Sequence, residues 1–119
     1  CEPERKKNIL RQQSSAERPN QRWISDVTCF KLGDHYFYIC MITDLFSRRV
    51  IKYKISKKNN TQLITTTFKM AHKERNPPIG LIFHSDRGAQ YTSHRFQQLL
   101  HEHHAKQSFS HPGKRMTMQ

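Results

Sequence analysis

The chain has 119 residues, enough for one domain, and its apolar share of 34% lies below the roughly 45–50% that is usual for globular proteins. Its 21 Lys and Arg residues against 9 Asp and Glu residues give a formal net charge of +12, which favours polyanionic partners through counterion release. The longest apolar run, 36–42, is far too short to span a bilayer, which argues against a membrane protein. Charge alone leaves open whether the partner is DNA or RNA, or whether the protein is simply a soluble basic one.

The first half of the chain predicts a basic extension followed by a hairpin. Residues 1–22 are polar and basic, as in a linker or a frayed helix end that could lie along phosphates. Aromatic and β-branched residues predict strands over 23–30 and 36–43, joined by a turn at Gly33 and Asp34.

The third predicted strand, 49–55, alternates between apolar and basic side chains. Its apolar residues are Ile51, Tyr53 and Ile55, and its intervening lysines are Lys52 and Lys54. A period of two puts the two groups on opposite faces of the strand. The lysines could contact DNA or could keep an edge strand from pairing with another chain, and both interpretations stay open.

The second half of the chain predicts helices that alternate with short strands. Asn60 is a good N-cap for a helix that runs to about Arg75, where two prolines follow. The remaining predicted elements are a buried apolar strand over 81–83, a helix capped by Ser93, and a short strand over 106–109. Three strands followed by helix, strand, helix and strand predict an α/β fold with a mixed sheet and an antiparallel start.

Two aspartates stand where sheet proteins commonly bind cations. Asp26 lies inside the first predicted strand, between Ile24 and Thr28 on one face, where a carboxylate is costly unless it is paired, hydrogen-bonded or bound to a cation. Asp86 directly follows the buried strand, at the carboxyl end where α/β sheets usually place their sites. The two carboxylates could hold hard cations, or each could cap local backbone.

Three segments, in the order found here, resemble signature segments of a known enzyme family. Two of them are Trp23–Thr28 and His84–Ser93, and Thr43–Arg48 resembles the stretch that joins the family's second and third strands. The resemblance covers roughly residues 16–114. The family is the integrase catalytic core (rve-type) of bacterial insertion-sequence transposases, which is similar to that of retroviral integrases.

The resemblance implies an RNase H-like fold and a D,D–E triad that binds two Mg²⁺ (or Mn²⁺) ions. Asp26 would be the first catalytic, metal-binding acid and Asp86 the second. Asp44 matches a position outside the triad and would be structural, bonding Ser47 or Arg48 in its turn. The intact parent is expected to cleave DNA at element ends and join it to target DNA as a homo-oligomer, in the bacterial cytoplasm with the nucleoid.

The third acid of the triad does not appear where the resemblance places it. Counting from Asp86, the Glu would stand just beyond Gln119, whereas Glu102 comes far too early, inside a predicted helix. Residues 23–114 are therefore expected to form a partial, C-terminally incomplete core, and residues 115–119 a divergent tail, as after a frameshift, a premature stop or a deliberate shortening. We expect the chain to be inactive or nearly so, because losing one member of a catalytic unit costs orders of magnitude in rate.

Seven basic residues are candidates for DNA contact: Arg48, Arg49, Lys52, Lys54, Lys57, Lys58 and Arg87. Most of them fall in the run 48–58, for which phosphate contact and a plain solvated edge are the two interpretations. The histidines His101, His103 and His104 could suggest zinc, with 101 and 104 expected on one helix face. A zinc site needs about four ligands, so a solvated histidine face is the favoured interpretation.

The cysteines and the N-terminal residues lead to three further expectations, about disulfides, the cell compartment and the natural N-terminus. Cys1, Cys29 and Cys40 are an odd number without a CxxC pair, which argues against a disulfide framework and a compact zinc knuckle. No signal peptide is visible, so a reducing cytoplasm is the expected compartment. Because the chain begins with Cys1 and not with Met, we expect the natural N-terminus to lie upstream.

Two rival functions remain open from the sequence. One is a non-catalytic nucleic-acid-binding remnant that uses only its basic surface, and the other is an RNase H-like nuclease that acts on RNA–DNA hybrids. Saturable Mg²⁺ binding that requires Asp26 would argue against the remnant. Hydrolysis of a hybrid without any joining of strands would favour the nuclease.

Overall fold

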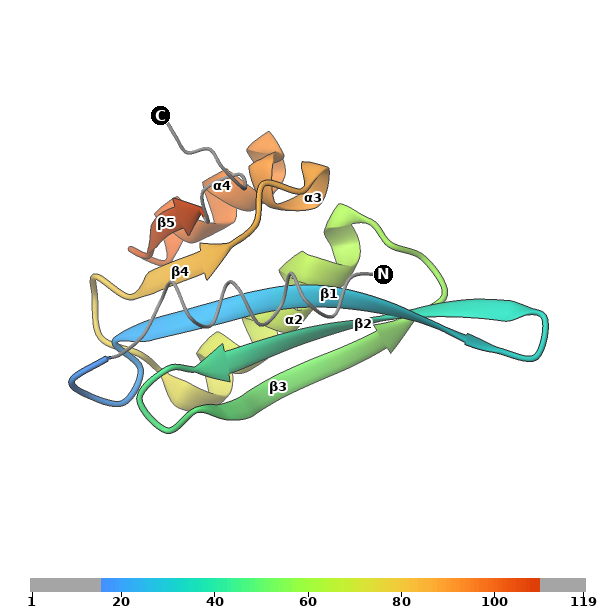
Figure 1. Cartoon of the computed structure of the whole chain (residues 1–119). Coiled ribbons are helices and arrows are strands. Elements are labelled where there is room, and N and C mark those ends of the chain that lie inside the picture. Colours follow the sequence, from blue (N-terminus) through green and yellow to red (C-terminus); the bar gives the residue numbers. More distant parts are fainter. Residues whose placement is uncertain (1–15, 110–119) are drawn as a thin grey trace, which may run out of the picture.

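In the computed structural model, the described part of the chain, residues 16–109, consists of one sheet of five strands and three helices (Figure 1). The strands are β1 (Arg22–Leu32), β2 (His35–Asp44), β3 (Arg49–Ser56), β4 (Ile82–Ser85) and β5 (Lys106–Phe109). The helices are α2 (Thr61–Arg75), α3 (Ala89–Thr92) and α4 (His94–Glu102). The predictions for 1–15 of the basic extension, for 110–114 and for the tail at 115–119 lie outside the described residues.

The strand order is β3-β2-β1-β4-β5, which puts β1 at the centre of the sheet. β1, β2 and β3 are antiparallel neighbours, whereas β4 pairs with β1, and β5 with β4, in parallel. This arrangement confirms the predicted mixed sheet and its antiparallel start. Among the elements of residues 16–109, only α3 was missed: it is a single turn in which the Gly88 carbonyl accepts from the N–H groups of Tyr91 and Thr92, too short to leave a periodic pattern.

Both longer helices begin at the residues predicted to cap them. The Asn60 side chain accepts a hydrogen bond from the N–H of Leu63, and the Ser93 side chain accepts one from the N–H of Phe96. α2 ends at Arg75, and its C-cap Asn76 has a left-handed backbone with φ 45°. These boundaries agree with the sequence because capping depends on neighbouring residues alone.

The core lies between the sheet and the helices and is centred on Phe68 of α2. Its ring meets those of Trp23 in β1, Phe83 in β4 and Phe96 in α4 edge-on, with centroids 6.1, 5.4 and 6.1 Å away. All four side chains are fully buried. These contacts join segments that are far apart in the sequence, and they hold β1 against β4.

β3 departs from the predicted alternation. The β2–β3 register shifts between Ile42 and Thr43, which leaves Ile51 in a bulge. Ile51 packs against the main core, whereas Tyr53 and Ile55 are 58% and 48% exposed. The predicted grouping of Ile51 with Tyr53 and Ile55 is therefore wrong, because the extra residue of a bulge changes which face the neighbouring side chains occupy.

Two smaller predictions from the sequence concerned the cysteines and membrane-spanning segments. Cys40 is buried with a free thiol. Within residues 16–109, no helix is both long enough and apolar enough to cross a bilayer.

Candidate functional site

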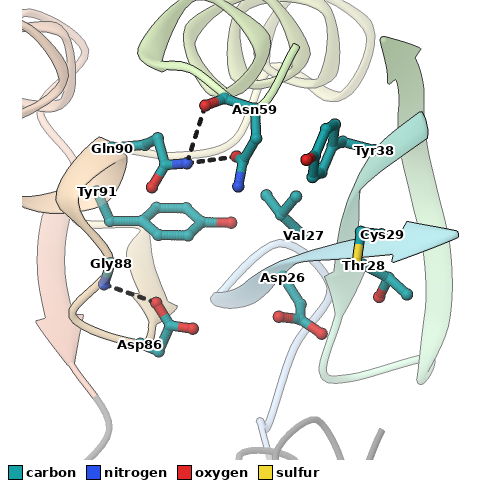
Figure 2. A pocket seen from close by; sticks show the side chains of 10 residues that line it. All are labelled: Asp26, Val27, Thr28, Cys29, Tyr38, Asn59, Asp86, Gly88, Gln90 and Tyr91. Atoms are coloured by element: carbon teal, nitrogen blue, oxygen red, sulfur yellow. Dashed lines mark hydrogen bonds between the residues drawn. The ribbon is translucent and has the colours of Figure 1, made fainter. Parts of the chain in front are cut away.

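Asp26 and Asp86 come from neighbouring parallel strands and line one cavity. β1 and β4 pair as far as Ile24 and His84, and Asp26 and Asp86 each follow two residues later in the chain. Partners in register lie on the same side of a sheet. Both side chains are partly buried and line a cavity of about 360 Å³, and Figure 2 shows their carboxylates along one edge of it. The fold thus brings together the two acids that the sequence singled out.

The turn after β4 fixes the orientation of the Asp86 carboxylate. The N–H of Gly88 donates a 2.8 Å hydrogen bond to Asp86 Oδ1, the usual way in which an aspartate stabilises its own turn (Figure 2). A Cβ on Gly88 would stand 3.0 Å from that same oxygen. Glycine is needed here for close approach, since its backbone φ is −57° and unstrained.

Two amide side chains form the opposite wall of the cavity. Gln90 of α3 donates through Nε2 to Oδ1 of Asn59, in the loop between β3 and α2, and lies 3.4 Å from the Asn59 carbonyl oxygen (Figure 2). The contact joins the loop after β3 to the turn after β4. Neither residue was predicted to belong to the site: Gln90 lies in one of the signature segments, but no local pattern distinguishes Asn59.

A buried polar contact lies next to the two aspartates. The Tyr91 hydroxyl is 2.9 Å from Ser25 Oγ, which is 3.7 Å from the Cys40 thiol, and all three residues are at most 2% exposed. Burial raises the pKa of the Tyr91 hydroxyl well above its usual value and also raises the pKa of the Cys40 thiol, and the nearby Asp26 charge acts in the same direction. Both groups are therefore neutral hydrogen-bonding groups at ordinary pH.

The donor set of the cavity suits a hydrated hard cation. Asp26 and Asp86 supply carboxylate oxygens, which Mg²⁺ and Mn²⁺ prefer, and Mg²⁺ is commonly held by one or two carboxylates with water completing its shell. Among residues 16–109, no group of three or more His, Cys, Asp and Glu side chains could hold a metal ion. Glu102, the one acid after Asp86 in the sequence, lines a separate groove between α2 and α4 with Lys69 and Arg95.

A family model described as the integrase core domain matches residues 16–115, which is most of the chain. The chain belongs to the integrase core domain family. Two transposases of Escherichia coli (strain K12) are similar over 106 residues, or 89% of this chain: the putative transposase InsK of insertion sequence IS150 at 37% identity, and the transposase InsF of IS3A at 36%. The chain spans only 38% and 37% of their lengths.

Solved structures confirm the RNase H-like architecture of this integrase core. The magnesium complex of the HTLV-2 integrase catalytic core domain, in its dimeric form, aligns with a TM-score of 0.70 at 26% identity, over 78% of this chain and 62% of that one. The simian T-cell lymphotropic virus intasome, in complex with PP2A regulatory subunit B56 gamma, aligns with a TM-score of 0.75 at 21% identity, over 82% of this chain and 34% of that one.

The basic run of this integrase core is divided between the two ends of β3. Arg48 lies in the turn before the strand with φ 62°, and Arg49 pairs with Asp44 at its start. Lys57 and Lys58 follow the other end of β3, directly before the Asn59 that lines the cavity. The lysine end of this run therefore leads into the loop that lines the cavity.

The other basic candidates differ in what they contact. Lys52 forms an ion pair with Glu74 of α2, so part of its charge is neutralised. Lys54 is exposed on β3. Arg87, next to Asp86, lies 5.1 Å from the centre of the Phe109 ring of β5, a cation–π contact that leaves its charge available to a phosphate.

The histidines do not form the helix face that the sequence predicted. α4 ends at Glu102, so His103 is its C-cap and His104 is left-handed with φ 57°. His101 and His104 consequently do not share a helical face, and that prediction is wrong. His103 instead stacks edge-on against His72, 4.5 Å between ring centres, and burial together with His103 lowers the pKa of His72.

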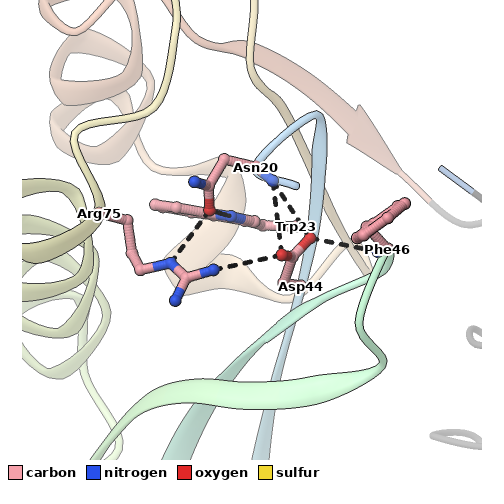
Figure 3. A network of polar contacts seen from close by, with 5 residues as sticks. All are labelled: Asn20, Trp23, Asp44, Phe46 and Arg75. Carbon is pink, nitrogen blue, oxygen red and sulfur yellow. Dashed lines mark hydrogen bonds and ion pairs between the residues drawn. The ribbon is translucent and has the colours of Figure 1, made fainter. Parts of the chain in front are cut away.

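Asp44 holds together the end of the sheet away from the cavity (Figure 3). Its fully buried carboxylate accepts from the N–H groups of Asn20 and Phe46 and lies 3.4 Å from Nη2 of Arg75. The backbone carbonyl oxygen of Asp44 accepts a hydrogen bond from the N–H of Arg48. This agrees with the predicted structural role of Asp44 in the turn. The contacts with Asn20 and Arg75 were not foreseen, because they come from distant parts of the chain.

Proposed function

We propose that this chain is the metal-binding part of a DNA strand-transferring transposase, with Asp26 and Asp86 as two of its three catalytic acids. The observation that carries the proposal is the position of both carboxylates in one cavity, each two residues beyond the last β1–β4 pair. Membership of the integrase core domain family and similarity to insertion-sequence transposases support it. The HTLV-2 integrase core, solved with magnesium, supports the choice of ion.

A divalent ion at Asp26 and Asp86 would activate the attacking water or 3′-hydroxyl and stabilise the leaving oxygen. The chain's own residues bind and orient: the N–H of Gly88 holds Oδ1 of Asp86 and so orients that carboxylate. Asn59 and Gln90 keep the loop after β3 closed against the turn after β4.

DNA is the proposed polyanionic partner, in the form of element ends and target DNA. Lys57, Lys58 and Arg87 lie on the segments that border the cavity and would contact the phosphates there. Arg48 and Arg49 lie at the far end of β3, so we assign them a secondary role. Assembly on paired DNA ends as a homo-oligomer is part of the proposal, and the HTLV-2 core is known in dimeric and trimeric forms.

Within residues 16–109, two acids line the cavity, and Glu102 lines another groove. We therefore expect this chain by itself to bind a divalent ion weakly and to transfer strands several orders of magnitude more slowly than an enzyme with a complete triad. Metal binding is accordingly the direct test of the site.

The test is a titration of the 119-residue chain with Mn²⁺ and Mg²⁺ by isothermal calorimetry. We expect saturable binding that Asp26→Asn and Asp86→Asn each abolish, while the exposed turn acid variant Asp34→Asn binds like wild type. Duplex DNA binding should remain in all three variants. Absence of saturable binding in wild type would leave the non-catalytic nucleic-acid-binding remnant as the better description.

A further inference from the structure

We infer that the Ser25–Tyr91 hydroxyl contact is a positioning device that sets the separation of Asp26 and Asp86, an inference that rests on the proposed metal site. Ser25 directly precedes Asp26 in β1, and Tyr91 follows Asp86 in α3. Their hydroxyl oxygens are 2.9 Å apart and buried. The contact therefore joins the two segments that carry the metal-binding acids.

The position of this contact follows from where the β1–β4 ladder stops. The last pair of the ladder is Ile24 with His84, so both aspartates stand beyond it. The ladder hydrogen bonds therefore do not set their separation directly. Ser25 and Tyr91 supply a hydrogen bond across the gap at the level of the acids, with the Tyr91 side chain reaching from α3 to β1.

Tyr91 is itself held in place by backbone hydrogen bonds and by aromatic packing. Its N–H donates to the Gly88 carbonyl, and its own carbonyl accepts a 2.6 Å hydrogen bond from Gln107 of β5. Its ring packs against those of Phe83 and Phe96, with centroids 6.4 and 5.9 Å away. Because the same Gly88 donates to Asp86, a continuous path of contacts runs from Ser25 through Tyr91 and Gly88 to the Asp86 carboxylate.

A hydroxyl pair that served packing alone would behave differently from one that positions metal ligands. Tyr91→Phe keeps the ring and its packing and removes only the hydrogen bond. The Ser25 hydroxyl then still has the Cys40 thiol 3.7 Å away, so the loss in stability is limited. Groups that orient metal ligands typically change metal affinity about 10–100-fold when they are removed.

The experiment compares Mn²⁺ affinity by calorimetry in the 119-residue chain for wild type, Tyr91→Phe, Ser25→Ala and the double variant. The control is Thr65→Val, which removes another buried hydroxyl, bonded to the Gln62 carbonyl within α2. We expect each single variant to weaken Mn²⁺ binding about tenfold, and the double variant to weaken it no further, because both changes break one contact. Thr65→Val should leave the affinity unchanged.

A second readout needs no metal. Amide hydrogen exchange over 86–92 should be faster in Tyr91→Phe than in wild type, and unchanged in Thr65→Val. Wild-type Mn²⁺ affinity in Tyr91→Phe, or additive losses in the double variant, would overturn the inference while leaving the metal site intact. Failure of wild type itself to bind Mn²⁺ would overturn the proposed function and this inference together.

Discussion

Gly88 shows how a single residue can control the candidate site without any side chain of its own. Its N–H holds Asp86 Oδ1 at 2.8 Å, and the space that a Cβ would need is already taken by that oxygen. Any larger residue would shift the carboxylate by a few tenths of an ångström. The sequence indicated a turn at this glycine, but the contact that makes glycine necessary is visible only in the structure.

Gly88→Ala is therefore expected to weaken Mn²⁺ binding by about tenfold with little change in melting temperature, because it moves a ligand and not the core. Calorimetric titration and thermal unfolding measure the two effects. Gly80→Ala is the control: Gly80 has φ +96° and open space around its Cβ position, so alanine there should cost stability and leave metal affinity unchanged. Unaltered Mn²⁺ binding in Gly88→Ala would contradict the role given to this contact.

Asp44 illustrates the opposite case, a buried acid whose role is structural. Asp44→Asn keeps the shape of the side chain and removes the negative charge that interacts with Arg75 and with two backbone N–H groups. This change should lower the free energy of unfolding by about 1–3 kcal/mol. Urea denaturation measures this. Glu74→Gln, which breaks the more exposed ion pair with Lys52, should cost at most about 1 kcal/mol. Equal losses in the two variants would argue that the Asp44 network is no stronger than a surface pair.

At the scale of elements, the helices agreed with the sequence more closely than the edge strand did. Asn60, Ser93 and the end of α2 follow from residues within a few positions of one another. β3 did not follow its own alternation, because its faces depend on the register with β2 and a bulge at Ile51 alters that register. A strand's pattern indicates its faces only when its partner pairs without interruption.

The cap of α2 offers a test at this scale. Asn60→Ala removes the acceptor for the Leu63 N–H and should lower the free energy of unfolding by about 1 kcal/mol, measured by urea denaturation. Asn60→Asp keeps an acceptor in the same place and should stay close to wild type. If the alanine variant were as stable as the aspartate variant, the cap would contribute nothing to the fold.

At the scale of the whole molecule, the net charge of +12 favours DNA, but the fold decides which charges can act at the site. Lys57 and Lys58 directly precede Asn59, which lines the cavity, whereas Arg48 and Arg49 lie at the other end of β3. A run that looked continuous in the sequence is therefore two separate groups in space.

Salt dependence of duplex DNA binding separates the two groups. In Lys57→Ala/Lys58→Ala, the slope of log affinity against log salt should fall in magnitude by about 2, one for each lost phosphate contact. Arg48→Ala/Arg49→Ala carries the same charge change and should alter the slope less than the lysine pair does. Fluorescence anisotropy over a salt series measures both, and equal changes would mean that DNA lies along the whole of β3.

The sequence by itself determined the order of the elements, the caps of both longer helices and the two candidate acids, because each depends on residue types and spacings within a short stretch of chain. Only the tertiary structure decided that Asp26 and Asp86 share one cavity, that Asn59 and Tyr91 belong to it, and that His101 and His104 do not form a face. The physical reason is that strand register and core packing join residues distant in the sequence, and no local pattern records which of them will meet.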